Sequence, residues 1–153
     1  MSEPGTNVQA EAAQAAAPTE SERQWAALAH VAALVLALCT SWIAGVAGML
    51  GAGIVYLVKR DASPFVAAHA REAFNFNLSM FVYAAVAAAI AFVLVGATVV
   101  TLGLGIILTA PAGIVLALVI LAISLMWLVC SIVAATKAWS GEPYRYPLTI
   151  RLL

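Results

Sequence analysis

The chain has 153 residues, of which 65% are hydrophobic and only 9% are charged, and its formal net charge is zero. A soluble domain carries about 25% charged residues, so this composition excludes an ordinary soluble domain and predicts a single integral membrane domain. Binding to nucleic acid is excluded too, because there is neither a net positive charge nor a basic patch.

Residues 1–21 are rich in Ala, Glu, Gln, Pro and Thr and contain no Lys or Arg. They lack the basic start and the apolar centre of a secretory signal. We therefore expect 1–21 to be a disordered, solvated cytoplasmic tail, followed by a transmembrane domain over residues 22–139.

The first helix is expected to begin at Ser21, with Gln24 completing a capping box and Trp25 at the membrane interface. The uncharged window 24–58 is short for two spans of about 20 residues each. We favour two short spans, about 25–41 and 43–58, joined by a turn at Thr40-Ser41-Trp42. The alternatives are a hairpin that does not cross fully and one over-long tilted helix.

The second of these spans has small residues at helical spacing, which would let another helix approach closely. Packing within the chain is favoured over a homodimer face. The two sets are Ala44/Gly48/Ala52 and Ala47/Gly51.

The polar stretch from Lys59 to Met80 separates the two long apolar regions. Ser63 can cap a helix and Pro64 suits its first position. With no helix breaker before Gly96, this helix would exceed the thickness of a bilayer. We therefore expect an amphipathic interfacial extension, then a bend, then a third span at about 75–95.

Residues 96–111 are apolar but contain three glycines and Pro111. They predict a loop or a short interfacial helix, with a re-entrant segment as the alternative. The fourth span is expected at about 112–136, with Gly141 as its stop. Residues 140–153 are expected to form an extended cytoplasmic tail on the membrane face.

Four spans place every basic residue on one side of the membrane. The positive-inside rule then puts both termini and the central joint in the cytoplasm. The seven residues are Arg23, Lys59, Arg60, Arg71, Lys137, Arg145 and Arg151.

A stripe of polar residues follows one face of the third helix, within an arc of about 120° on a helical wheel. Its members are His69, Glu72, Asn75 and Ser79. They could line a path for protons or ions, although structural bonding to one another and to neighbouring helices is favoured. His30 of the first span lies at a similar depth, and a buried imidazole needs a partner. We therefore expect a contact from His30 to Glu72 or Asn75.

We predict no catalytic, cofactor-binding or metal-binding residues and no enzyme activity. The pattern His69-x-x-Glu72 lacks the second His of a zinc protease, and a metal site made of His30, His69 and Glu72 is not favoured. Cys39 and Cys130 lie in apolar runs near opposite faces of the membrane, so no disulfide between them is expected.

Three stretches carry a family resemblance: ERQWAALAHVAAL, KRDASPFVAAHAREAFNFNLS and GEPYRYPLTIRLL. Together they resemble a family of small bacterial membrane proteins classed as a domain of unknown function, related to the magnetosome proteins MamF and MmsF and grouped with the Tic-twenty component of the chloroplast import machinery. The resemblance covers 20–153 and implies the bacterial inner membrane. Asn77 departs from the Gln that is common in relatives. The motif residues are Trp25, His30, Ser63, Pro64, Phe65, Val66, His69, Glu72, Ala73, Asn75, Gly141, Glu142, Tyr144, Tyr146 and Pro147.

Two functions remain open. The favoured one is a non-enzymatic interaction or accessory subunit, whose partners would be the lipid bilayer and either a second copy or another membrane protein. The alternative is a channel or translocation component in which the polar stripe lines a path.

Overall fold

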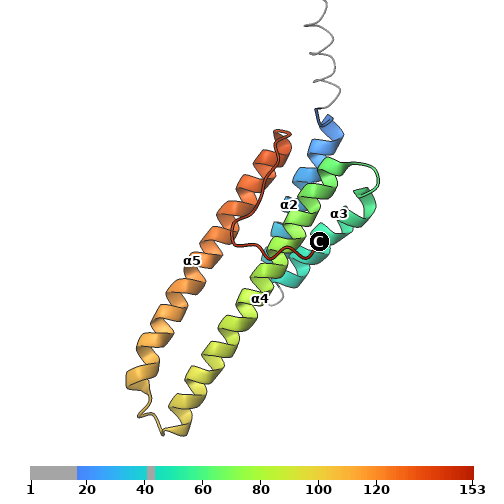
Figure 1. Cartoon of the computed structure of the whole chain (residues 1–153). Helices are drawn as coiled ribbons and strands as arrows, with labels where there is room; N and C mark the ends of the chain where they lie inside the picture. Colours follow the sequence, from blue (N-terminus) through green and yellow to red (C-terminus); the bar gives the residue numbers. More distant parts are fainter. Residues whose placement is uncertain (1–16, 41–43) are drawn as a thin grey trace, which may run out of the picture.

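The computed structural model describes residues 17–40 and 44–153, which form four helices in two antiparallel hairpins (Figure 1). The first hairpin consists of α2 (Glu20–Cys39) and α3 (Ala44–Lys59), and the second of α4 (Pro64–Val100) and α5 (Ile106–Trp139). The all-helical prediction is confirmed for this part of the chain. The turn predicted at Ser41–Trp42 and most of the tail predicted over 1–21 lie outside the described residues.

The two hairpins differ in length. α2 contacts all three other helices, whereas α3 packs on α2 and α4 alone. The first hairpin lies beside the N-terminal half of α4, and the second hairpin extends well beyond it (Figure 1). α4 and α5 are long and apolar enough to cross a membrane, while α3 is a shorter apolar helix. Full crossing by the first hairpin stays a prediction.

The start of α2 differs from the predicted cap. Thr19, not Ser21, caps the helix, and Glu22 closes the capping box by accepting a hydrogen bond from the Thr19 backbone N–H at 2.8 Å. The observed capping box, Thr19 with Glu22, uses a carboxylate, whereas the predicted box, Ser21 with Gln24, would use a neutral amide. A carboxylate accepts a stronger hydrogen bond from the backbone N–H and also interacts favourably with the positive end of the helix dipole. The Gln24 side chain instead donates to Glu20. At α4 the predicted Ser63 cap and the first-turn Pro64 are confirmed.

Glu22 also ties the start of α2 to the start of α4, because Ser63 Oγ donates to its carboxylate at 2.6 Å. This bond and the Thr19 bonds lower the pKa of Glu22. The resulting stability is present above the ordinary Glu pKa of about 4.3 and is lost as pH falls through the lowered value.

Thermal unfolding of detergent-solubilised protein tests this contribution. As pH falls from about 6 to 3, the melting temperature of Ser63→Ala should decrease less than that of wild type. The control Ser21→Ala, at an exposed position, should match wild type; equal acid profiles for all three proteins would contradict the prediction.

The glycines of α3 let this helix approach its neighbours closely. A Cβ added at Gly48 would lie 2.2 Å from Asn77 Oδ1 on α4, and one at Gly51 would lie 2.8 Å from Leu36 on α2. Gly45 meets Phe81 of α4 in the same way. The predicted close approach is therefore confirmed as packing within the chain.

The far end of the second hairpin corrects the predicted loop. α4 continues through Gly96 to Val100, α5 already begins at Ile106, and Pro111 lies inside it. A 2.7 Å hydrogen bond between the hydroxyl groups of Thr98 and Thr109 joins the two helices at this end. Pro111 lies in the second turn of α5, where it removes one intrahelical hydrogen bond. The turn is only residues 101–105, with Leu102 and Gly103 at positive φ.

Candidate functional site

The C-terminal segment, residues 140–153, folds back from the end of α5 onto α4 (Figure 1). Gly141 stops α5 with φ +79°, and the Glu142 N–H reaches the Lys137 carbonyl at 2.9 Å, which is a Schellman closure. The predicted helix stop at Gly141 is confirmed, whereas the location of residues 140–153 on the membrane face stays a prediction. We call residues 140–153 the C-terminal tail.

The polar stripe of α4 is the surface that holds this tail. Asn75 Oδ1 accepts hydrogen bonds from the backbone N–H groups of Leu152 (3.1 Å) and Leu153 (3.2 Å), and Asn75 Nδ2 donates to the main-chain oxygen of Leu153. Ser79 Oγ accepts from Ile150 N at 2.8 Å and donates to its own helix. Asn75 and Ser79 are buried. One turn further on, Tyr83 donates to the Leu148 carbonyl at 2.7 Å.

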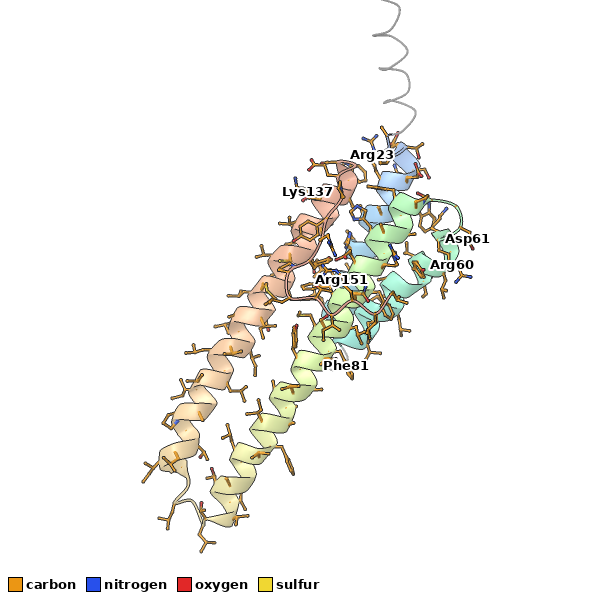
Figure 2. The ribbon with its side chains drawn as sticks, viewed as in Figure 1. Arg23, Arg60, Asp61, Phe81, Lys137 and Arg151 are labelled. Carbon is orange, nitrogen blue, oxygen red and sulfur yellow. The ribbon has the colours of Figure 1, made fainter. Side chains whose placement is uncertain are left out.

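Glu72 is the charged member of the stripe and binds the tail at two points. Its carboxylate accepts from Tyr146 N at 3.2 Å and pairs with Arg151 Nε at 3.1 Å. Arg145 approaches the same carboxylate at 3.9 Å. Because the Glu72 side chain is only 15% exposed, its charge is partly withdrawn from water and needs these partners. Figure 2 shows Arg151 between α5 and α4, away from the far end of the hairpin.

The two histidines and Tyr146 form a buried chain of hydrogen bonds. Tyr146 Oη lies 2.9 Å from His30 Nδ1, and His30 Nε2 lies 2.9 Å from His69 Nδ1. Burial raises the pKa of Tyr146, so its hydroxyl keeps its proton and donates to His30. The network then assigns a proton to His30 Nε2 and another to His69 Nε2. His69 Nε2 itself is buried and makes no hydrogen bond within the described residues.

These contacts correct the predicted partner of His30. The imidazole was expected to reach Glu72 or Asn75, yet its partners are His69 and Tyr146. The predicted depth agrees with the structure, but the side chains of Glu72 and Asn75 bind the C-terminal tail instead. The idea that a buried imidazole requires a polar partner holds.

Tyr146 fixes the tail sterically as well. Its ring stacks on Phe76 of α4, with centroids 3.9 Å apart and planes within 12°. Tyr144 packs against Tyr146 edge to face. Burial, followed by the neighbouring Cys130, raises the pKa of Tyr144 to about 12, so both phenols remain neutral at physiological pH.

The sequence points to Tyr146 and Asn77 only through the family resemblance, and it gives Tyr83 no role. Tyr146 and Tyr83 supply a buried and an exposed contact, and Asn77 donates to the Ala73 carbonyl beneath Gly48. The pair Tyr144-x-Tyr146 was a usable signal, because two tyrosines in a short tail need a surface to cover them. Nothing in the sequence around Asn77 distinguished it from the polar stripe.

The arrangement is a docking surface, with its polar groups engaged by the chain itself. The tail occupies the face of α4 that a polar path along His69, Glu72, Asn75 and Ser79 would need open. Among residues 17–40 and 44–153, no three His, Cys, Asp or Glu side chains gather as metal ligands. Cys39 and Cys130 are free thiols.

The fold and the site together define the class: an all-helical protein with two long apolar helices, each long enough to cross a membrane, and a C-terminal tail docked on one of them. Large apolar side chains such as Phe92 (80% exposed) and Leu108 (81%) point outward from these helices, as lipid contact demands. The chain belongs to the magnetosome magnetite crystal formation protein family, MamF_MmsF, which it matches over residues 21–153. No curated protein and no solved structure matches it.

Proposed function

We propose that this chain is a non-enzymatic, multi-pass membrane protein that serves as an interaction or accessory subunit. Its partner-binding face would consist of the joint between α3 and α4, the start of α4 and the C-terminal tail. The observation that carries the proposal is the tail itself. Three stripe residues, Glu72, Asn75 and Ser79, together with His30 and Tyr83, bind it through hydrogen bonds, which gives a small protein a defined polar surface.

Orientation follows from the distribution of charge. The start of α2, the joint between α3 and α4 and the end of α5 lie toward the same end of the bundle, as the labelled Arg23, Asp61 and Lys137 illustrate (Figure 2), and the C-terminal tail folds back from there along α4 (Figure 1). The far loop, residues 101–105, contains no charge. The positive-inside rule then favours a cytoplasmic location for the charged end in a bacterial inner membrane.

The family description concerns magnetite crystal formation. Participation through other proteins fits this chain better than direct binding of iron. Its seven acidic residues are dispersed along the sequence, and they form no cluster of ligands in the described part. A crystal-forming role would then run through the partner that the polar face recruits.

Native mass spectrometry of the full chain, extracted gently from its own membrane, tests the proposal. We expect a second protein in stoichiometric amount. Asn75→Ala, which removes three hydrogen bonds to the tail, should lose this partner. Leu152→Ala should retain it, because that side chain is 72% exposed and only its backbone binds Asn75. A homo-oligomer without another protein would instead favour the channel, and a lone monomer would contradict the accessory role.

A further inference from the structure

A cavity of about 330 Å³ lies between the start of α4 and the C-terminal tail. Arginines contribute three of its eleven lining residues: Arg71 from α4, and Arg145 and Arg151 from the tail. The tail builds half of this cavity by folding back. Arg71 and Arg151 are eighty positions apart in the sequence, and nothing in the sequence indicates that they line the same cavity.

The charges of the cavity do not balance. Glu72 is the one carboxylate side chain in the wall, and it pairs with Arg151 at 3.1 Å. Arg145 reaches it only at 3.9 Å and keeps 73% of its side chain exposed. Arg71 is exposed and makes no ion pair or hydrogen bond within the described residues. The main-chain carboxylate of Leu153 also lines the cavity. Counted with Glu72, it leaves the wall an excess of about one positive charge, which an anion with several acceptor oxygens would neutralise.

The cavity lies at a defined level of the helices. Glu72 is the last charged residue of α4, and no other charge follows until Lys137 near the end of α5. The tail returns Arg145 and Arg151 to the level of Glu72. The three guanidinium groups thus gather at the boundary between the charged end and the apolar body of the bundle, where the phosphates of a bilayer lie.

The remaining walls are suited to an amphiphile. Phe65 and Ala68 of α4 and Pro143 of the tail are apolar lining residues beside the arginines. A free phosphate ion would leave these walls in contact with water, whereas a glycerol backbone and the first acyl carbons would cover them. The same cavity reaches His69, whose Nε2 atom is buried.

We propose that this cavity binds the phosphate of an anionic membrane phospholipid, with Arg71 and Arg145 as its principal ligands. The inference rests on the membrane embedding in the proposed function, although it does not need a protein partner. Since one face of the site is the tail, bound lipid would also hold the tail against α4.

Lipid retention by the purified full chain tests the site. Protein in non-ionic detergent is titrated with phosphatidylglycerol or phosphatidylcholine, and bound lipid is counted by native mass spectrometry. We expect phosphatidylglycerol to bind about tenfold more tightly, and Arg71→Gln to remove most of this preference, because each charge-assisted hydrogen bond contributes about a tenfold factor or more. Arg60→Gln is the matched control: it removes the same charge from an exposed arginine whose ion pair, with Asp61, lies outside the cavity.

A second variant distinguishes lipid binding inside the cavity from attraction of lipid by the positive surface charge in general. Ala68 is exposed and lines the cavity, so Ala68→Phe should fill it with all the arginines retained, and should also abolish the preference. Equal binding of the two lipids, or equal losses in Arg71→Gln and Arg60→Gln, would overturn the proposal.

A competition experiment with inorganic phosphate distinguishes a lipid headgroup from a free phosphate ion. If millimolar phosphate displaced phosphatidylglycerol and this displacement depended on Arg71, the site would be assigned to free phosphate and the lipid proposal would be overturned. Loss of lipid preference with the protein partner still bound would leave the accessory role intact.

Discussion

Replacing Tyr146 by Ala is expected to lower the free energy of unfolding by about 3–5 kcal/mol and to release the C-terminal tail from α4. Tyr146 is 3% exposed, and its ring stacks on Phe76. Truncation would therefore open a cavity at the centre of the tail contact. It would also leave His30 Nδ1 without its donor. Unfolding in mixed micelles measures the first effect, and limited proteolysis after α5 measures the second.

Tyr146→Phe separates the ring from the hydroxyl. The ring stack should survive, and the loss should be about 1–3 kcal/mol, because a buried acceptor on His30 loses its hydrogen bond. Leu152→Ala is the control in the same tail and should stay within about 0.5 kcal/mol of wild type. If Tyr146→Ala cost no more than Leu152→Ala, the tail would not be docked through this residue.

The polar stripe could be predicted because a helix fixes the angles between its residues. His69, Glu72, Asn75 and Ser79 share a face in any α-helix, and each of them is engaged by a contact from another segment. The identity of that segment could not be predicted. Asn75 and Ser79 bind backbone groups of the tail, which every residue other than proline can offer, so this part of the contact leaves little record in the tail's sequence. The side chains of Tyr146 and Arg151 are the exceptions.

The partner of His30 shows a second limit. Topology fixes the depth of a residue in the membrane, but the rotation of α2 depends on which of its faces packs inward. That face is a seam of alanines, Ala26, Ala29, Ala33 and Ala37, all buried. Alanine is so common in this chain that the seam does not stand out in the sequence. When this alanine face of α2 packs inward, the helix is rotated so that His30 points to His69 and Tyr146.

The turn at residues 101–105 shows why glycine and proline in residues 96–111 predicted a longer loop than the structure has. Gly96 has nothing within 4 Å of an added Cβ, so no close packing explains it and no turn requires it. In lipid the backbone has no water to bond with, which keeps such a segment helical where a soluble protein could open a loop. Helix end signals from soluble proteins therefore overestimated the length of this turn.

Two glycines of the same chain provide a matched test of this packing. Gly48→Ala is expected to lower the free energy of unfolding by about 1–3 kcal/mol, because an added methyl group overpacks a close helix contact. The new Cβ would lie 2.2 Å from Asn77 Oδ1 and 3.2 Å from the Ala33 carbonyl oxygen. Asn77 cannot move aside freely, since its amide is buried and donates to the Ala73 carbonyl at 2.8 Å.

Gly96→Ala is the opposite case within α4. An added Cβ would meet open space, and alanine loses less backbone entropy in a helix, so we expect no loss and a gain of up to about 1 kcal/mol. Unfolding of both variants in the same mixed micelles gives the comparison. Equal effects would mean that α3 does not press against Asn77.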